Sequence, residues 1–384
     1  MGYMETSNHG SLYWFGLALL DKDFKIYLKK KCYYNRYPAM EYLARKKVFS
    51  DITNRMRRTF PKQFNFAPIS FLVPEHCEEL ETYMSAHPNF FWIGKPSCGR
   101  GGEGIMLLQK YNDIPKNLLT NQEKDLLVQR YVKNPLLIEG KKFDLRLYVL
   151  VKGYDPIEAY IANEGLARLC TEKYRQPTKE NMKNMFMHLT NFSLNKNSEN
   201  FIAPTENFLE DDIGSKRLMT SLWKGLEEQG YDVAKVKEKI TDTVRKTIIT
   251  LEPYLLYNYH SKVDTEHQEA KNFHILGIDI LLDKKLNAWL MEINANPSLC
   301  MFIEKDPIPG EPEPDKILSD LDRFVKTKVI GEAIKIVSGQ GNDDYDGTYE
   351  KILPVEDGSF DCYYIWNRAT ELFELMISCG KQTD

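Results

Sequence analysis

Two apolar segments near the C-terminal end constrain the fold more than any other feature of the chain. Residues 273–282 read Phe-His-Ile-Leu-Gly-Ile-Asp-Ile-Leu-Leu, and residues 286–294 read Leu-Asn-Ala-Trp-Leu-Met-Glu-Ile-Asn, with a short charged stretch between them. Two β-prone segments joined by such a stretch predict an antiparallel hairpin. A turn centred near Lys285 places Asp279 across from, or diagonal to, Glu292.

The predicted hairpin gathers oxygen ligands on one face. Asn294 lies two residues beyond Glu292, so both side chains project from the same side of the strand. Together with Asp279, they bring two carboxylates and an amide oxygen to a face that is otherwise apolar. Such ligands suit Mg²⁺, which bridges protein carboxylates and substrate phosphates. A hairpin with a solvated polar face is the alternative, but the set of three inside apolar strands favours a metal site.

A glycine-rich segment upstream is a candidate phosphate loop. Residues 99–104 contain four glycines, and Lys95 precedes them on an expected strand. Glycines let the backbone approach phosphate oxygens and direct its N–H groups at them, although a flexible turn has the same composition. In a P-loop the lysine follows the glycines, and a protein kinase adds H-R-D and D-F-G motifs. Neither pattern occurs here.

The following strands offer two further features. Residues 126–132 form an apolar strand whose end has backbone groups available for an adenine edge. Lys142, Asp144 and Arg146 then alternate with apolar residues, which is the period of a strand with one polar face. The spacing by itself fits a solvated face as well as a functional one.

Taken in order, these motifs resemble the tubulin–tyrosine-ligase-like family of ATP-grasp amino-acid ligases. The resemblance extends from about residue 35 to residue 297, most of the chain. Its motifs are residues 95–97 with 102–105, 129–131, 142–146, 164–168, 188–193, and Asp279 with residues 292–297.

The resemblance implies an α+β ATP-grasp fold with N-terminal, central and C-terminal lobes. We expect residues 1–85 to form the N-terminal lobe with a basic face, and residues 86–135 to form the central lobe. The C-terminal lobe with the Mg²⁺ site then comprises residues 136–305. A linker and an acidic, partly helical tail make up residues 306–384, with helices expected at 317–337 and 363–378.

The resemblance also implies roles for individual residues. It gives ATP and Mg²⁺ as cofactors, with Asp279, Glu292 and Asn294 as the metal ligands and Glu292 also counted among the catalytic residues. Arg146 and Arg168 would steady a transferred phosphoryl group or a substrate carboxylate, as suits a guanidinium. His188 is expected to be structural. The nucleotide-binding positions are Lys95, Gly101, Gly102, Gly104, Gln129, Arg130, Tyr131, Val132, Lys142, Asp144, Thr190 and Asn191.

The implied activity is an ATP-dependent carboxylate–amine ligation through an acyl phosphate. Residues 164–168 and 187–195 look most like the polyglutamylating branch, which adds free glutamate to glutamate side chains of tubulin C-terminal tails. Glycylating members carry Cys where Thr190 stands. A glycine ligase, a glutamylase of a non-tubulin acidic protein, and a non-catalytic microtubule-associated protein are the alternatives. The sequence leaves open chain initiation versus elongation, and α- versus β-tubulin.

Composition and charge add expectations about partners. Residues 21–62 contain 13 basic and 4 acidic residues, although the whole chain has a net charge of -4. This basic segment fits an acidic protein, a nucleic acid or only solvent, and the resemblance favours the Glu-rich tails of tubulin. The 7 cysteines show no C-x-x-C spacing, so neither disulfides nor zinc are expected. We expect a monomer that binds microtubules and neither nucleic acid nor membrane, located in the cytoplasm on the cytoskeleton, with the cilium, axoneme or basal body as specific sites.

Overall fold

The computed structural model describes residues 10–16, 19, 24, 26–27, 32–97, 101–120, 125–154, 156–209, 213–261, 271–303, 316–339 and 347–355. Residues 98–100 of the glycine loop, the linker and the expected helix 363–378 lie outside these ranges.

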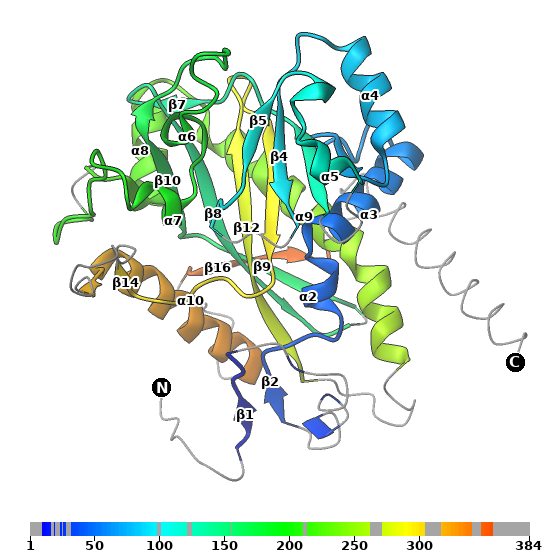
Figure 1. The fold of residues 1–384 in the computed structure, drawn as a ribbon. Helices are drawn as coiled ribbons and strands as arrows, with labels where there is room; N and C mark the ends of the chain where they lie inside the picture. Colours follow the sequence, from blue (N-terminus) through cyan, green and yellow to red (C-terminus); the bar gives the residue numbers. More distant parts are fainter. Residues whose placement is uncertain are drawn as a thin grey trace, which may run out of the picture.

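Figure 1 shows the elements, which occur along the chain in the following order: β1 (Leu12–Tyr13), β2 (Tyr33–Tyr34), α2 (Met40–Leu43), α3 (Lys46–Thr59), β3 (Ser70–Val73), α4 (Cys77–Ala86), β4 (Trp92–Pro96), β5 (Met106–Leu108), η1 (Tyr111–Asp113), α5 (Lys116–Thr120), β6 (Leu126–Arg130), β7 (Leu137–Ile138), β8 (Lys141–Lys152), β9 (Glu158–Ala162), β10 (Leu166–Lys173), α6 (Met185–His188), α7 (Phe192–Asn195), β11 (Lys216–Leu218), α8 (Met219–Glu228), α9 (Val233–His260), β12 (Phe273–Leu282), β13 (Ala288–Asn294), β14 (Phe302–Ile303), β15 (Ile317–Leu318), α10 (Asp320–Ser338) and β16 (Tyr349–Leu353).

The larger sheet contains the predicted hairpin. Its strands lie in the order β11-β10-β8-β12-β13, and every neighbouring pair is antiparallel. Strands β12 and β13 pair with Asp279 directly opposite Glu292, which confirms one of the two registers that the sequence allowed. The turn is centred where the sequence predicted it. Within the turn, a side-chain oxygen of Asp283 accepts a hydrogen bond from the Lys285 N–H at 2.8 Å.

Alternation along β8 and β12 gives this sheet two different faces. On one face, residues 143, 145, 147 and 149 of β8 and residues 276, 278, 280 and 282 of β12 pack in one core with α9. On the other, Tyr148 and Leu150 of β8 with Phe273 and Ile275 of β12 pack against α10. The polar residues of both strands share this second face, where an open cleft lies beside α10.

The smaller sheet has the strand order β3-β6-β4-β5 and is antiparallel throughout. Trp92 of β4 and Val128 of β6 pack in a core with Leu80 of α4 on one face. On the opposite face, Ile93 lies in a second core with Leu189, a residue of the segment that borders the cleft. Lys95, two residues after Ile93, therefore projects toward the cleft.

The two long helices cover the faces of the large sheet. Apolar residues recur every three or four positions from Val233 to Leu251, a spacing that predicts an amphipathic helix packed on the sheet. These positions are all buried in the core with the sheet, and α9 continues past them to His260. The predicted tail helix is also present, but it begins at Asp320 because the Ser319 side chain caps it by accepting from the Asp322 N–H at 3.2 Å. Residues 317–318 instead form the short strand β15.

The packing of α10 bears on the predicted lobes. Val325 and Val329 of this helix share a core with Phe273 of β12, although the sequence places the helix in a separate tail segment. Likewise β3, from the expected N-terminal lobe, pairs with β6 of the expected central lobe. The lobe boundaries remain predictions. Across the described ranges, no helix combines the length and the apolar character needed to cross a membrane.

Candidate active site

Two rows of charged side chains cross the large sheet on the cleft face. In the first, Lys216 of β11, Arg168 of β10 and Asp144 of β8 lie opposite one another in register. In the second, Arg146 of β8, Asp279 of β12 and Glu292 of β13 do the same. Because residues 144 and 146 are two apart on β8, both rows project from one face. All six residues line a cleft of about 1010 Å³.

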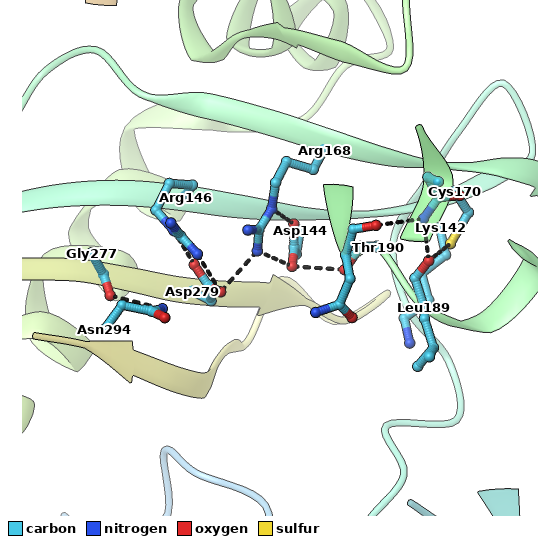
Figure 2. A network of polar contacts seen from close by, with 12 residues as sticks. Lys142, Asp144, Arg146, Arg168, Cys170, Leu189, Thr190, Gly277, Asp279 and Asn294 are labelled. Atoms are coloured by element: carbon cyan, nitrogen blue, oxygen red, sulfur yellow. Dashed lines mark hydrogen bonds and ion pairs between the residues drawn. The ribbon is translucent and has the colours of Figure 1, made fainter. Parts of the chain in front are cut away.

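The centre of these rows is a buried ion-pair network (Figure 2). Arg146 donates to both carboxylate oxygens of Asp279, at 2.5 Å from Nε and 3.0 Å from Nη2. Arg168 lies between the two aspartates, 2.9 Å from Asp279 and bidentate on Asp144 at 2.8 and 2.6 Å. The Thr190 hydroxyl donates to Asp144 at 2.7 Å. Burial opposes ionisation of Asp279, but Arg146 and Arg168 outweigh it and lower its pKa to about 2.

The absence of a side chain at Gly277 allows this arrangement. Gly277 lies two residues before Asp279, and a Cβ built on it would lie 2.8 Å from the Pro297 Cβ and 3.3 Å from the Arg146 Cδ. The 2.8 Å distance to Pro297 is shorter than the contacts of packed side chains. The glycine therefore leaves room for the Arg146 side chain over this part of the strand.

The hairpin end of the cleft has the three predicted oxygen ligands. Glu292 is half-buried and lies 3.1 Å from the Nζ of Lys46, the first residue of α3. Asn294 donates its Nδ2 to the Gly277 carbonyl at 3.4 Å, which turns its Oδ1 away from that carbonyl. Among the residues that the structure describes, no group of three or more Asp, Glu, His or Cys side chains could hold a metal ion.

The donor set nevertheless fits a hard cation. Asp279 and Glu292 face each other across the register and Asn294 follows on the same face, as the sequence predicted. An ionised carboxylate has about four lone-pair sites, and the arginines occupy three of those of Asp279. Two carboxylates with an amide oxygen, completed by water or substrate oxygens, are the ligands that Mg²⁺ prefers.

Two buried lysines reach the cleft from different sheets. Lys95 of β4 donates to the Gln129 Oε1 at 2.7 Å, and Lys142 of β8 donates to the His188 carbonyl at 2.8 Å and the Tyr131 hydroxyl at 3.2 Å. Burial lowers the pKa of each lysine to about 8, and Glu292 and Asp144 respectively oppose the shift. These groups change charge at mild pH, so an anion beside them would raise their affinity for protons.

The strand predicted to contact adenine comprises residues 126–132. The N–H groups of Arg130 and Tyr131 donate to the carbonyls of Ile69 and Phe91 at 2.9 and 2.8 Å. The Arg130 guanidinium lies 5.7 Å from the Trp289 ring, and the Tyr131 side chain is buried. Gln129, Arg130, Tyr131, Val132 and Gly104 are absent from the lining of the large cleft, and Gln129 borders a small adjoining cavity with Lys95. Their nucleotide contacts remain predictions.

The described part of the glycine loop lies against the segment with Thr190 and Asn191. Gly101 and Gly102 have φ values of 65° and 94°, and a Cβ on Gly101 would lie 2.5 Å from the Ser193 Oγ. Ser193 also donates to the Gly101 carbonyl at 3.0 Å. Positive φ and this close approach both require glycine, and Gly101 and Gly102 line the cleft. Their contact with phosphate remains a prediction.

His188 has the surroundings of a structural residue. Its side chain is fully buried, and its Nδ1 lies 3.2 Å from the Tyr131 hydroxyl. Burial and the nearby Lys142 lower its pKa to about 4, so the imidazole is neutral at physiological pH. His188 also lines the cleft, and its structural role remains a prediction.

The structure adds residues that sequence reasoning missed. Lys46, Lys216, Asp322 and Lys326 all line the cleft, and the last two come from α10. Asp322 and Lys326 are four residues apart, a spacing that marks one face of a helix, but the sequence offered no reason to turn that face toward the active site. Lys46 was visible only as one of many basic residues near the N-terminus.

Two antiparallel sheets that direct lysines, arginines and carboxylates into one cleft have the organisation of an ATP-grasp ligase. The profile of the "Tubulin-tyrosine ligase family" matches residues 27–306, well over half of the chain. The chain therefore belongs to the tubulin-tyrosine ligase family, a family of ligases that use ATP.

Curated relatives agree with this assignment. The chain is 38% identical to "Tubulin polyglutamylase TTLL11" of Homo sapiens over 85% of its own length and 45% of that protein. It is 37% identical to "Tubulin polyglutamylase ttll6" of Danio rerio, over 85% of this chain and 38% of the relative. A "Probable beta-tubulin polyglutamylase" of Tetrahymena thermophila is 33% identical over 91% of this chain and 31% of its own length. The chain thus spans less than half the length of these relatives.

Proposed function

We propose that this protein is an ATP-dependent ligase that adds glutamate to glutamate side chains of tubulin C-terminal tails. The observation that carries the proposal is the row formed by Arg146, Asp279 and Glu292, which faces a large cleft beside two buried lysines. The names of the relatives, all tubulin polyglutamylases, support glutamate as the donor and tubulin as the acceptor. No feature of the cleft favours glycine ligation or a non-catalytic role.

In this proposal the cofactors are ATP and Mg²⁺. Asp279, Glu292 and Asn294 hold the cation, which would supply charge neutralisation at the transferred phosphoryl group. Lys95 and Lys142 bind phosphate oxygens, and Gly101, Gly102 and Gly104 bring the backbone close to them. The adenine lies at Gln129, Arg130, Tyr131 and Val132. Asp144, Thr190 and Asn191 complete the nucleotide contacts.

Ligation proceeds in two steps. An acceptor carboxylate oxygen attacks the γ-phosphorus of ATP, the bond to the ADP oxygen breaks, and an acyl phosphate forms. The amine of free glutamate then attacks the acyl carbon, phosphate leaves with the bonding electrons, and the nitrogen loses a proton to give an amide.

The arginines serve both steps. Arg146 and Arg168 lie in the two neighbouring rows and are bound by Asp279 and Asp144, so their guanidinium groups are held in place before substrate arrives. Such fixed charges lower the barrier because they need no rearrangement when negative charge develops. A protein nucleophile is not required.

The proposed partners are tubulin tails and free glutamate. The protein would act on the cytoskeleton as a monomer in the cytoplasm, and the cilium, axoneme and basal body remain predictions for its location. The basic helix α3, which starts at Lys46 beside the cleft, is suited to an acidic tail.

The test is intact mass spectrometry of tubulin and of a Glu-rich tail peptide after incubation with the protein, Mg-ATP and Glu, Gly or Tyr. We expect a ladder of glutamyl-sized increments with Glu alone, which is lost in Glu292→Gln. Increments with Gly alone would identify a glycine ligase. No increment from a folded, ATP-binding preparation would refute the proposal.

A further inference from the structure

A buried histidine lies near the point where strand β13 leaves strand β12, and the proposed function gives it no role. The described ladder between the two strands ends at the pair of Gly277 and Asn294, which is the last residue of β13. His274 shares the side of β12 on which Leu276 packs against α9, so it projects away from the cleft. Its side chain is 1% exposed. Any effect of this imidazole on the reaction must therefore pass through the backbone.

The two ring nitrogens of His274 contact two segments that are far apart in the chain. The backbone nitrogen of Tyr37 lies 3.2 Å from Nδ1, and the carbonyl oxygen of Ala295 lies 2.6 Å from Nε2. A backbone N–H can only donate and a carbonyl can only accept, so Nδ1 is the acceptor and Nε2 carries the proton. Burial and the nearby Arg36 lower the pKa of His274 to about 3, which keeps the ring neutral in this tautomer.

Both residues that follow Asn294 are tied to partners outside their own strand. His274 donates to the Ala295 carbonyl, which fixes the backbone. Asn296 donates its Nδ2 to a carboxylate oxygen of Glu41 on α2, which fixes a side chain. The histidine contact is the nearer of the two to Asn294 along the chain, so it restrains the end of β13 most directly.

The end of this strand depends on such an anchor. The side-chain bond from Asn294 to the Gly277 carbonyl is long, at 3.4 Å, and gives little support by itself. The end of a ladder opens more readily than its centre, because it has paired neighbours on one side only. A fixed peptide group directly after Asn294 restricts the backbone from which this side chain projects into the cleft.

The other ring nitrogen is held by the segment before α2. Tyr34 forms an isolated parallel bridge with Asn272, and the Asn272 Nδ2 lies 3.4 Å from the Arg36 carbonyl. These contacts place the segment beside β12 just before His274, and the Tyr37 N–H then fixes the orientation of the ring. Nε2 therefore points at the Ala295 carbonyl whether or not the cleft contains a ligand.

We propose that His274 is a positioning residue of the cation site, whose Nε2–H anchors the Ala295 carbonyl and thereby holds Asn294 in place to bind Mg²⁺. The inference rests on the proposed function, in which Asn294 is a cation ligand beside Asp279 and Glu292. Replacing a group that orients the ligands of a metal commonly weakens metal affinity roughly 10- to 100-fold.

Two substitutions separate the roles of the two ring nitrogens. His274→Gln keeps a donor near the position of Nε2, whereas His274→Asn keeps an acceptor near the position of Nδ1 and loses the donor. Each variant leaves one buried backbone group without its partner, so we expect their melting temperatures to fall by similar amounts. Only His274→Asn should weaken the cation site. The control is His260→Asn, at the exposed histidine that ends α9.

The measurement is the Kd of a non-hydrolysable ATP analogue for the full chain, by calorimetry, with excess Mg²⁺ and again with EDTA. We expect Mg²⁺ to tighten binding in wild type, His274→Gln and His260→Asn, and this gain to be ~10- to 100-fold smaller in His274→Asn. With EDTA the four proteins should agree within about threefold, because the lysines proposed to bind phosphate are unchanged.

The outcomes distinguish this inference from the proposed function. A full Mg²⁺ gain in His274→Asn, an equal loss in both His274 variants, or a weaker Kd with EDTA would overturn the inference. A wild type that gains nothing from Mg²⁺ would refute the cation site and the inference together. A wild type that gains from Mg²⁺ but adds no glutamate would refute the proposed function alone. If His274→Asn does not fold, His274→Met, which fills the space of the ring without a donor, is judged by the same outcomes.

Discussion

The ion pairs at the hairpin end of the cleft join three cations to three carboxylates, whereas those at the α10 end join two lysines to one aspartate. The first group comprises Lys46, Arg146 and Arg168 with Glu292, Asp279 and Asp144. The second comprises Lys216, Lys326 and Asp322.

Both groups contain buried ion pairs, although Lys46 and Glu292 are only half-buried, and the groups differ in the ratio of cations to carboxylates. In the first group each cation contacts a carboxylate, and Lys95 and Lys142 add further positive groups to the same cleft. In the second group two ammonium groups contact the single carboxylate of Asp322. The comparison shows that the two ends of the cleft differ in how many cations each carboxylate contacts.

The largest expected effect comes from removing a carboxylate at the hairpin end. Glu292→Gln keeps the shape of the side chain but removes one charge from the proposed cation site, and we expect the rate of glutamate addition to fall at least ~100-fold. Rates are measured from the mass increments of a tail peptide. Glu238→Gln, on the exposed side of α9, is the control. A residual rate within tenfold of wild type would contradict a role for Glu292 in holding the cation.

Replacing one positively charged residue at each end of the cleft tests the difference between the two ion-pair groups. Arg168→Met leaves Asp144 without its bidentate partner and Asp279 with Arg146 alone, so we expect the free energy of unfolding to fall by about 3–5 kcal/mol. Lys326→Met should cost clearly less, since Asp322 still contacts Lys216. Urea denaturation measures both. Equal losses in the two variants would show that charge balance does not distinguish the ends.

The buried lysines predict how ATP affinity varies with pH. Burial lowers the pKa of Lys142 to about 8, and phosphates bind its charged form, so binding takes up a proton once the pH exceeds this value. ATP affinity should therefore be nearly constant below pH 8 and should fall roughly tenfold per pH unit above it for each lysine that titrates.

The measurement is the Kd of a non-hydrolysable ATP analogue between pH 7 and 9.5. Lys142→Arg, which stays charged, should give a flatter profile above pH 8. A wild-type profile that is flat across this range would mean that Lys142 does not bind phosphate in its charged form.

The smallest effect is expected at a glycine beside the network. The Cβ of Gly277→Ala would press on Pro297 and Arg146, so we expect a loss of about 1–3 kcal/mol in unfolding free energy and a reduced rate of ligation. Gly16→Ala, where a Cβ meets nothing within 4 Å, is the control for thermal stability. A fully active, fully stable Gly277→Ala would show that Arg146 adapts without cost.

The sequence predicted the hairpin end well because the signals there are local. Strand alternation places residues 142, 144 and 146 on one face, and a short charged turn fixes Asp279 against Glu292 within one register step. The helical spacing from Val233 to Leu251 likewise predicted α9, and both expectations were confirmed. Nothing in these stretches depends on knowledge of distant residues.

The sequence did not predict the α10 end, because the contacts there join residues that are far apart in the chain. Lys216 becomes part of the site only because β11 pairs with β10, and Asp322 and Lys326 only because α10 packs on the large sheet beyond a linker. The same holds for Lys46, which reaches Glu292 from a helix almost 250 residues away in sequence. Ion pairs between segments far apart in the chain produce no residue periodicity or spacing that the sequence could show.

By itself, then, the sequence determined the two sheets' key strands, the acidic hairpin, the glycine loop and the family resemblance, since each rests on residues close together in the chain. The tertiary structure alone decided which charges balance one another across the cleft. These contacts depend on distances of 2.5 to 3.1 Å between side chains from separate elements, and those distances are set by how β10, β11, β13, α3 and α10 pack.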